Sequence, residues 1–349
     1  MANILVVSRG NLPSRAANSV QIYKTAKYMA ELGHEVYLSI DHNCPEQVIK
    51  EFYGESKVTV LNAFPFRNTH NLRRLTNLIY KKKIQNYVKE LKIDIIFTRD
   101  LLLLPKMNLK TQVIWETHDW NYSPKVKERI DCIQSLKVIT ISSNLRRRIF
   151  EHYTIDAMVL HDACDGINFV ETDLVEKKVV FTGHLYEHRG IDQILRVARS
   201  LPDLIFEIYG GLEKDITYWK TQNKNKNVIF KGFVSPKKVG EIQATAGILL
   251  INYSKKLNTA KYCSPLKLTE YISTGNIVVS SDFGPIVEEY KEYIQTFEAD
   301  NDQALIQTLK NICRGYERLL KLQKKKVSSR PPLDWVERCE ELLKIGQTK

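Results

Sequence analysis

Short apolar runs alternate with amphipathic stretches along the chain. Residues 4–7 form an unbroken apolar run, and a loop rich in Gly, Asn, Pro and Ser follows it. Apolar positions then recur at helical spacing from Val20, with Asn18 and Ser19 placed to cap that helix and Gly33 to end it. Residues 34–40 are the next strand. This order predicts a βαβ unit of a parallel sheet.

The same pattern returns in the middle of the chain. Residues 179–182 are predicted as a strand, 183–190 as a loop and 204–209 as the returning strand. The helix between them carries apolar residues at i, i+3, i+4 and i+7, namely Ile191, Ile194, Leu195 and Ala198. Two such units predict an α/β fold of two doubly wound, Rossmann-like domains, with the ligand site expected in a cleft between them.

Composition shifts suggest where the domains end. We place the boundary in the polar segment 162–169, which gives domains of residues 1–165 and 166–325. Residues 321–332 are basic and end in two prolines, which is typical of a linker. Residues 326–349 are therefore predicted as a linker and a last helix, whose apolar stripe is made by Trp335, Val336, Cys339, Leu342 and Leu343.

The charge balance favours anionic partners. The 349 residues include 52 Lys and Arg against 40 Asp and Glu, a net charge of +12, and the excess is spread along the chain. Nucleic acid, an anionic membrane surface and phosphorylated ligands all fit this balance. A nucleic-acid partner is disfavoured, because the sequence has no recognition-helix, zinc-finger or aromatic RNA-binding pattern.

Other features point to a cytoplasmic location. No apolar run approaches the ~20 residues of a membrane helix, and the N-terminus lacks the pattern of a signal peptide. The six cysteines are dispersed, which is typical of reduced thiols. We therefore expect a cytoplasmic protein, with peripheral contact at the inner membrane face as a further expectation from charge.

Residues 264–275 make the most informative segment. Ser264 can cap a helix, Pro265 suits its first position and Gly275 suits its C-terminal stop. The free N–H groups of such a helix start form an anion site, to which Lys267 adds a charge and Glu270 an acceptor for hydroxyl groups. The alternative interpretation is an ordinary surface ion pair between Lys267 and Glu270.

A second candidate is the loop 183–190. It joins a strand to a helix, where phosphates commonly bind, but it is neither a dinucleotide fingerprint nor a Walker loop. Arg189 is placed to clamp a diphosphate, and a solvent-facing arginine is the alternative. His184 and His188 have metal-ligand spacing without an obvious third ligand, so we interpret them as structural and expect no metal.

In the first half, the candidates again follow strands. His118 lies just after residues 112–115 and is placed to bond a substrate hydroxyl or move a proton, with simple packing between tryptophans as the alternative. Arg99 follows the strand at 94–98, and Ser14 and Arg15 lie on the first loop. These three are weak acceptor-side candidates.

Two charged patterns have simpler explanations. Asp300-Asn301-Asp302 spells D-x-D, but Asp302 precedes a helical apolar pattern, so capping explains it. The basic runs 81–83 and 146–148 are typical of solvated helix faces, with a membrane-surface role as the alternative.

Several segments together resemble glycosyltransferase family 4, the retaining enzymes of the GT-B fold, over nearly the whole chain. Residues 179–211 are similar to that family's strand, loop and helix of the donor domain, with Arg189 where the family usually has Lys. Residues 264–282 are similar to its "S-P-L-K-L-x-E-Y" donor segment. Residues 138–145 and 159–169 resemble its N-domain strand and interdomain connection. The last helix resembles the family's terminal helix, which crosses back to the first domain.

This resemblance implies roles for the candidate residues. Glu270 would hold the ribose hydroxyls, and His118 would contact the donor sugar. Arg189, Lys267 and the helix start would bind the diphosphate and stabilise the leaving group. The implied catalytic residues are His118, Arg189 and Lys267, and the implied donor-binding set is Gly183, His184, Arg189, Ser264, Pro265, Leu266, Lys267, Leu268 and Glu270.

The resemblance also implies a reaction. It is the transfer of a hexose or N-acetylhexosamine from a UDP- or GDP-sugar, with retention and without a metal or other cofactor, to a glycan or lipid-linked acceptor in surface polysaccharide synthesis. Tyr262 stands where the family often has a paired Glu that holds the sugar, so the donor sugar is left open. A basic nucleic-acid-binding protein, or a GT-B-shaped enzyme of other chemistry such as an epimerase, remains as the alternative.

Overall fold

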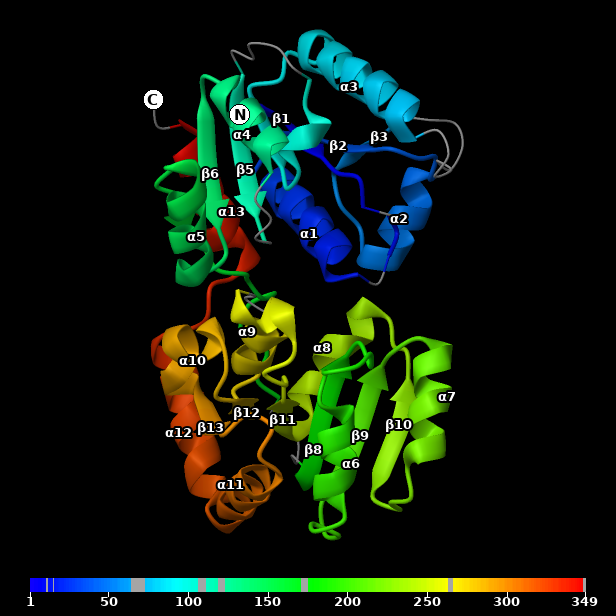
Figure 1. Ribbon diagram of the computed structural model, residues 1–349, viewed down its shortest axis with the longest axis vertical. Coiled ribbons are helices and arrows are strands. Elements are labelled where there is room, and N and C mark those ends of the chain that lie inside the picture. Colours follow the sequence, from blue (N-terminus) through cyan, green and yellow to red (C-terminus); the bar gives the residue numbers. More distant parts are fainter. Residues whose placement is uncertain are drawn as a thin grey trace. The chain divides into compact units, whose positions relative to one another are not determined.

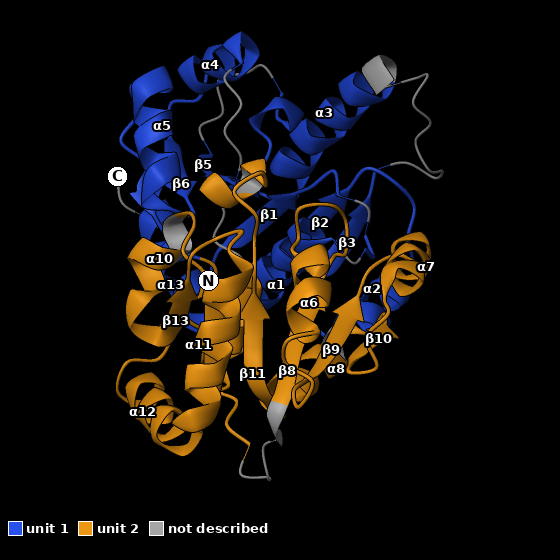
Figure 2. Ribbon diagram, turned by 60° about the horizontal axis from the view of Figure 1, so that its bottom comes forward, with its two compact units in different colours: residues 1–161, 335–349 blue, residues 162–334 orange. Residues whose placement is uncertain are grey.

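The computed structural model describes residues 1–10, 12–14, 16–63, 73–105, 111–118, 123–170, 175–262 and 266–347. The chain divides into two compact units, which Figure 2 colours separately. Unit 1 consists of Met1–His161 and Trp335–Lys349, and unit 2 of Asp162–Asp334. Each unit is built on its own parallel sheet.

The sheet of unit 1 has seven strands in the order β3-β2-β1-β4-β5-β6-β7 (Figure 1). The strands are β1 (Asn3–Val7), β2 (Glu35–Ile40), β3 (Thr59–Asn62), β4 (Ile95–Thr98), β5 (Gln112–Thr117), β6 (Leu136–Thr140) and β7 (Met158–Val159). Side chains alternate across β1, because Ile4 and Val6 belong to one apolar cluster and Leu5 and Val7 to another. Both faces of this sheet are therefore buried.

Helices cover the two faces of this sheet. They are α1 (Ala17–Glu31), α2 (Glu46–Tyr53), α3 (Arg73–Glu90), α4 (Pro124–Asp131), α5 (Ser143–Tyr153) and α13 (Trp335–Gln347), with a 3₁₀ turn at Leu101–Leu103. Helix α13 is last in the chain, yet it packs on α1 and β5 of unit 1. Its Cys339, Leu342 and Leu343 lie in the same apolar cluster as Ile22 and Met29.

The sheet of unit 2 has six strands in the order β10-β9-β8-β11-β12-β13. The strands are β8 (Val175–Gly183), β9 (Ile205–Gly210), β10 (Val228–Gly232), β11 (Ala246–Ile251), β12 (Ile277–Ser281) and β13 (Ile294–Phe297). Its helices are α6 (Ile191–Ala198), α7 (Glu213–Gln222), α8 (Pro236–Ala244), α9 (Leu266–Ser273), α10 (Pro285–Tyr290), α11 (Asp302–Arg314) and α12 (Tyr316–Ser329), with 3₁₀ turns at Asn258–Lys261 and Lys291–Tyr293. This confirms the predicted fold class, two doubly wound parallel sheets with a terminal helix that returns to the first unit.

Two local predictions were wrong, and one predicted strand is longer than expected. Helix α1 begins at Ala17 with Ala16 as its N-cap, so Asn18 and Ser19 lie inside it, because the Ala16 carbonyl already accepts from Ser19 N at 2.9 Å. Residues 321–329 are the second half of α12 rather than a linker, since Gln323 and Val327 continue the buried face that Tyr316 begins. The strand predicted at 179–182 is longer and begins at Val175.

The strand orders place one reversal point in each sheet. In unit 1 the chain reverses between β1 and β4, and in unit 2 between β8 and β11. Open α/β sheets bind ligands at the carboxyl ends of the strands that flank such a point. The candidate residues can therefore be located relative to these two edges.

Candidate functional site

The loop after β8 is held against the end of β11. Gly190 begins α6 with φ +79°, and its carbonyl accepts a hydrogen bond from Asn252 Nδ2 at 2.6 Å. A Cβ at position 190 would lie 2.1 Å from the Asn252 carbonyl oxygen, so only glycine fits. Ser254 N donates to the His188 carbonyl at 3.3 Å. These bonds fix the loop 183–190 at the reversal point of the unit 2 sheet.

Two cations of this edge share one aromatic ring. The Arg189 guanidinium lies 4.9 Å from the centre of the Tyr253 ring, and the Lys267 ammonium lies at the same distance from it. Arg189 also stacks on Tyr186 at 4.7 Å and donates to its hydroxyl. Lys267 lies 4.2 Å from the Phe181 ring. The structure thus brings together two positive charges that the sequence places 78 residues apart.

The backbone at the end of β8 lies next to Lys267. Lys267 Nζ donates to the Thr182 carbonyl at 3.4 Å, and a Cβ on Gly183 would lie 3.8 Å from the same nitrogen. His184 lies beside Tyr186, with ring centres 5.7 Å apart. Burial, together with the charges of Arg189 and Lys267, lowers the pKa of His184. His184 is therefore a neutral ring at physiological pH, and the positive charges beside it are Arg189 and Lys267.

Glu270 lies one turn further along α9. Its Oε2 accepts from Gln243 Nε2 at 3.2 Å, and Gln243 Nε2 also lies 3.4 Å from Thr182 Oγ1. Lys267 and Glu270 thus have different neighbours, the first at β8 and the aromatic rings and the second at α8. Glu270 is half-buried, and its carboxylate is held by a buried amide near the end of β8.

The remaining donor candidates differ in what they contribute. Leu266 is the first described residue of α9, and Leu268 is fully buried in the apolar core, which leaves its backbone for a ligand. Gly275 follows the helix end with φ +68°, as predicted for its C-terminal stop. Ser264 and Pro265 lie outside the described residues, and Tyr262 is half-buried just before them.

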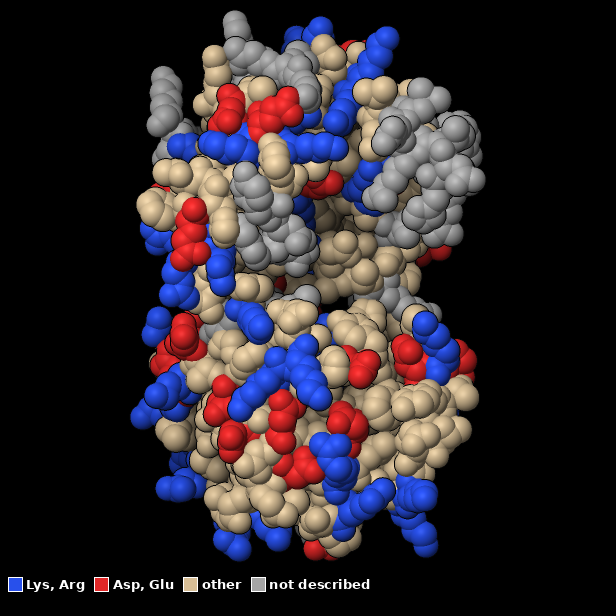
Figure 3. Space-filling view, in the orientation of Figure 1, with Lys and Arg blue, Asp and Glu red and all other residues tan. Residues whose placement is uncertain are grey.

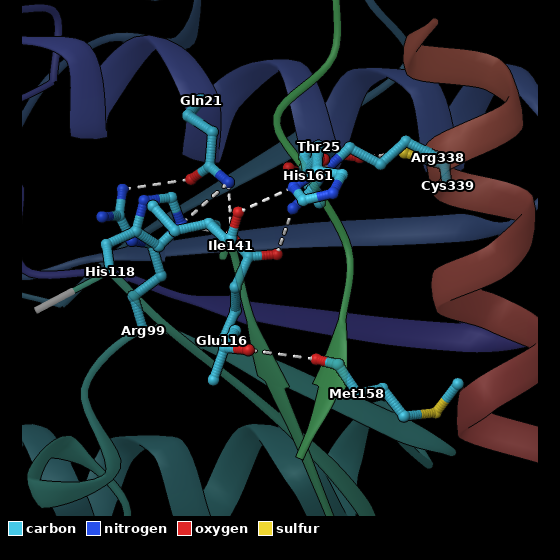
Figure 4. A network of polar contacts seen from close by, with 11 residues as sticks. Gln21, Thr25, Arg99, Glu116, His118, Ile141, Met158, His161, Arg338 and Cys339 are labelled. Carbon is cyan, nitrogen blue, oxygen red and sulfur yellow. Dashed lines mark hydrogen bonds and ion pairs between the residues drawn. The ribbon is translucent and has the colours of Figure 1, made fainter. Parts of the chain in front are cut away.

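A buried polar network lies at the carboxyl end of β5 in unit 1 (Figure 4). Glu116 has no exposed side-chain area, and its Oε2 accepts from Arg338 of α13 at 2.6 Å. Its Oε1 lies 2.5 Å from His118 Nε2 and also accepts from Gln21 Nε2 of α1. Arg99 donates to Gln21 Oε1 at 3.0 Å. Two of the candidate residues, His118 and Arg99, thus meet in one network.

The network determines the proton positions on His118. Burial alone would raise the pKa of Glu116, but Arg338 and His118 hold it well below its usual range, so the carboxylate is ionised and only accepts. The His118 nitrogen at 2.5 Å must then carry the hydrogen. Burial and Arg99 lower the pKa of His118 to about 4, so the ring is neutral near pH 7 with Nδ1 unprotonated.

Ser14 is the other acceptor-side candidate among the described residues, and it has different partners. Ser14 N donates to the Tyr53 hydroxyl at 2.7 Å, and the same hydroxyl donates to the Ser14 carbonyl at 2.6 Å. Ser14 therefore ties the first loop to α2, and within the described residues its hydrogen bonds are made to this loop and to Tyr53 rather than to the Glu116 network. Arg15 lies outside the described residues.

The D-x-D segment is structural, with one correction. Asn301 is the N-cap of α11 and accepts from Ala304 N at 3.0 Å, so the cap is one residue earlier than predicted. Asp302 instead forms an ion pair with Arg196 at 2.6 Å. Within the described part of the chain, no group of three or more His, Cys, Asp or Glu side chains could hold a metal ion.

Several residues that build these two edges were not among the predicted site residues. Glu116 had a signal, because a carboxylate within an apolar strand must find a partner. Arg338 had one too, since it interrupts the apolar stripe of the last helix between Trp335 and Leu342. Tyr253, Asn252 and Gln243 meet their partners only through long-range packing and had no local signal.

Comparison with known proteins identifies the family. Residues 168–327 match the family model "Glycosyl transferases group 1", and residues 19–166 match "Glycosyltransferase Family 4". An α-galactosylglucosyldiacylglycerol synthase from Streptococcus pneumoniae is 29% identical over 163 residues, which are 41% of this chain and 43% of that enzyme. The chain thus aligns with less than half the length of this relative.

Solved structures share the fold over the whole chain. A glycosyltransferase from Rickettsia africae superposes with a TM-score of 0.74 and 15% identity, covering 99% of this chain and 98% of that one. Anabaena Alr3699/HepE, solved in complex with UDP and glucose, has a TM-score of 0.68 and 12% identity, with 99% of each chain covered. The two family models and this fold lead to one conclusion: the chain belongs to the group 1 glycosyltransferases of family 4, with the GT-B fold.

Proposed function

We propose that this glycosyltransferase moves a hexose or N-acetylhexosamine from a UDP- or GDP-sugar, with retention, to a glycan or lipid-linked acceptor in surface polysaccharide or glycolipid synthesis. The observation that carries the proposal is the pair Arg189 and Lys267, fixed over one tyrosine ring at the reversal point of unit 2. A diphosphate carries the complementary charge. A uridine diphosphate in the related Anabaena structure supports this donor class.

The chemistry follows from where charge develops. The bond between the anomeric carbon and the diphosphate oxygen breaks, and negative charge grows on the leaving group. Arg189 and Lys267 are preorganised to stabilise that charge without a metal ion. The acceptor oxygen bonds to the anomeric carbon, and its proton passes to the leaving diphosphate. Glu270 accepts from the ribose hydroxyls, and His118 Nδ1 accepts from a sugar hydroxyl.

Calorimetric titration with UDP, GDP and ADP in the presence of EDTA tests the donor class. We expect binding of UDP or GDP that is weakened at least about tenfold by Lys267→Met and by Glu270→Gln, since each loses a charged hydrogen bond. Lys310→Met and Glu317→Ala change exposed helical residues of the same unit and should leave affinity unchanged. Binding of none of the nucleotides, or equal effects of test and control variants, would contradict the proposal. Tight salt-sensitive RNA binding would favour the nucleic-acid alternative.

Helix α3 supports a peripheral contact with an anionic membrane. Leu78 and Ile79 on it are 66% and 41% exposed, and Lys82 and Lys89 are exposed on the same helix. Within the described part of the chain, no helix is both long and apolar enough to cross a membrane. On the face drawn in Figure 3, basic and acidic side chains are interspersed in both units.

Vesicle co-sedimentation tests this contact. We expect binding to phosphatidylglycerol-containing vesicles that exceeds binding to pure phosphatidylcholine, falls with added salt and is reduced by Leu78→Ser. Equal binding to both vesicle types at low salt would remove the membrane from the proposed function.

A further inference from the structure

The ion pair between Glu116 and Arg338 is costly to bury. Neither side chain has exposed area, so neither charge contacts bulk solvent. Burying such a pair in place of apolar residues often gives no gain in stability, and removing one partner is strongly destabilising because it leaves the other charge buried and unpaired. Position 338 lies within an apolar stripe, where a leucine would pack without this cost. Anchoring of α13 therefore does not by itself explain why a charged residue stands at position 338.

The two carboxylate oxygens of Glu116 have different partners. Oε2 accepts from Arg338, while Oε1 accepts from His118 and Gln21. Arg338 is itself fixed, because its Nε donates to the His161 carbonyl at 2.8 Å. The backbone at His161 thus orients Arg338, Arg338 orients the carboxylate, and the carboxylate orients the His118 ring. Figure 4 shows this chain of contacts from α13 to β5.

We propose that Arg338 is a positioning residue for His118: through Glu116 it holds the imidazole in the Nε2–H tautomer and leaves Nδ1 as the acceptor for a hydroxyl of the donor sugar. The proposal rests on the proposed function for the identity of that hydroxyl. The tautomer and ring orientation themselves follow from the network and are measurable without a substrate.

The charged groups that face His118 in the described structure make the effect predictable. They are Glu116 of β5, Arg99 after β4 and Arg338 of α13, and α1 contributes the neutral Gln21. Arg338 opposes protonation of His118 and keeps Glu116 ionised. Without Arg338, the ring should take up a proton at higher pH and lose its fixed tautomer.

Four variants of the full chain separate positioning from anchoring. Arg338→Met removes the charge. Arg338→Lys keeps the charge, but its ammonium group lacks the planar, fixed donor geometry of a guanidinium. The double variant Glu116→Gln/Arg338→Met leaves no unpaired buried charge, so it should fold even where Arg338→Met does not. Lys344→Met is the control, because it breaks only the exposed ion pair with Glu341 on the same helix.

Four measurements are made on each variant. Imidazole nitrogen NMR reports the tautomer and titration of His118. Steady-state kinetics with the donor that binds report kcat and KM across pH, and calorimetry reports affinity for the free nucleoside diphosphate. Thermal unfolding confirms that the variant is folded.

For Arg338→Met and the double variant, we expect mixed His118 tautomers. We also expect a roughly 10- to 100-fold fall in kcat, because the His118 ring is then no longer held in position against the sugar. Nucleotide affinity should stay within twofold, because the nucleotide candidates lie in unit 2. In Arg338→Met, the acid limb of kcat should move to higher pH. Arg338→Lys should recover part of kcat, and Lys344→Met should match the wild type.

An anchoring role gives a different result. A lower melting temperature with wild-type kcat, pH profile and His118 spectrum in the folded double variant would overturn the proposal. If the wild type transfers no sugar at all, the proposed function fails. The NMR comparison then still decides whether Arg338 sets the His118 tautomer.

Discussion

Asn252 holds Gly190 so closely that no side chain fits at position 190. The Asn252 amide donates to the Gly190 carbonyl at 2.6 Å, and a Cβ on Gly190 would lie 2.1 Å from the Asn252 carbonyl oxygen. This contact joins the start of α6 to the end of β11, the two elements that flank the candidate diphosphate site. The position of Arg189, next to Gly190, depends on it.

Gly190→Ala should therefore displace the loop that carries Arg189. We expect a loss of about 2–4 kcal/mol in the free energy of unfolding, because a positive φ and a backbone clash both oppose the methyl group. Gly232→Ala is the matched control, since Gly232 has φ +77° and nothing within 4 Å of an added Cβ. Gly232→Ala should lose about 1 kcal/mol of unfolding free energy, because only the positive φ opposes its methyl group. Urea unfolding of both variants makes the comparison, and equal losses would contradict the clash.

The ring of Tyr253 should matter more than its hydroxyl. Both Arg189 and Lys267 lie over that ring, and a cation over an aromatic face gains about 0.5–2 kcal/mol. Tyr253→Leu should weaken nucleoside diphosphate binding by roughly 10-fold, whereas Tyr253→Phe should bind like the wild type. Calorimetry on both, with the exposed Tyr218→Leu as control, is the test. A Phe variant as weak as the Leu variant would assign the effect to the hydroxyl.

Stability should fall as the pH drops below 6.5. The pKa of His118 is lowered to about 4 and that of Glu116 is held well below its usual range, so the unfolded chain binds more protons than the folded one in acid. The contribution of His118 to the free energy of unfolding is fully present above pH 6.5, the pKa of an unfolded histidine. It is lost as the pH falls toward 4. Denaturant unfolding at pH 7.5, 6 and 4.5 measures this loss. His118→Gln should flatten the pH dependence, and an unchanged slope would show that His118 does not contribute.

The cap of α11 gives a prediction about stability alone. Asn301 accepts from Ala304 N, so Asn301→Ala should cost about 1 kcal/mol of unfolding free energy. Ser235 is the N-cap of α8 without a side-chain cap bond among the described residues, so Ser235→Ala is the control and should cost much less. Thermal or urea unfolding compares them. Similar losses would mean that the capping bond contributes little.

Local pattern was sufficient for most of the fold. The βαβ unit that opens each half of the chain, the other strands and the last helix all follow from apolar periodicity, which acts over a few residues. The linker prediction failed because four lysines between residues 321 and 326 hid the buried stripe of Gln323 and Val327. The predicted N-cap of α1 was wrong because Asn and Ser also occur inside the first turn of a helix.

The candidate site was predictable only in part. Arg189 and His118 follow predicted strands, and parallel topology brings strand ends to one edge of a sheet, while Lys267 was found from the capping pattern of a helix start. Tyr253 and Arg338 could not be assigned this way, because their partners are distant in sequence. Glu116 and Arg338 are separated by 222 positions, and only the return of α13 to unit 1 brings them together.

That return also has a consequence for synthesis. Glu116 leaves the ribosome 222 residues before Arg338, a delay of roughly 10–40 s at 5–20 residues per second. Unit 2 is continuous in sequence and can fold while unit 1 still lacks the helix that seals one face of its sheet. Chains truncated after residue 334 and released from the ribosome should therefore be cut by protease in unit 1 and resist it in unit 2. Equal protection of the two units would show that the first 161 residues fold without α13. Unit 1 could then fold before unit 2 during synthesis.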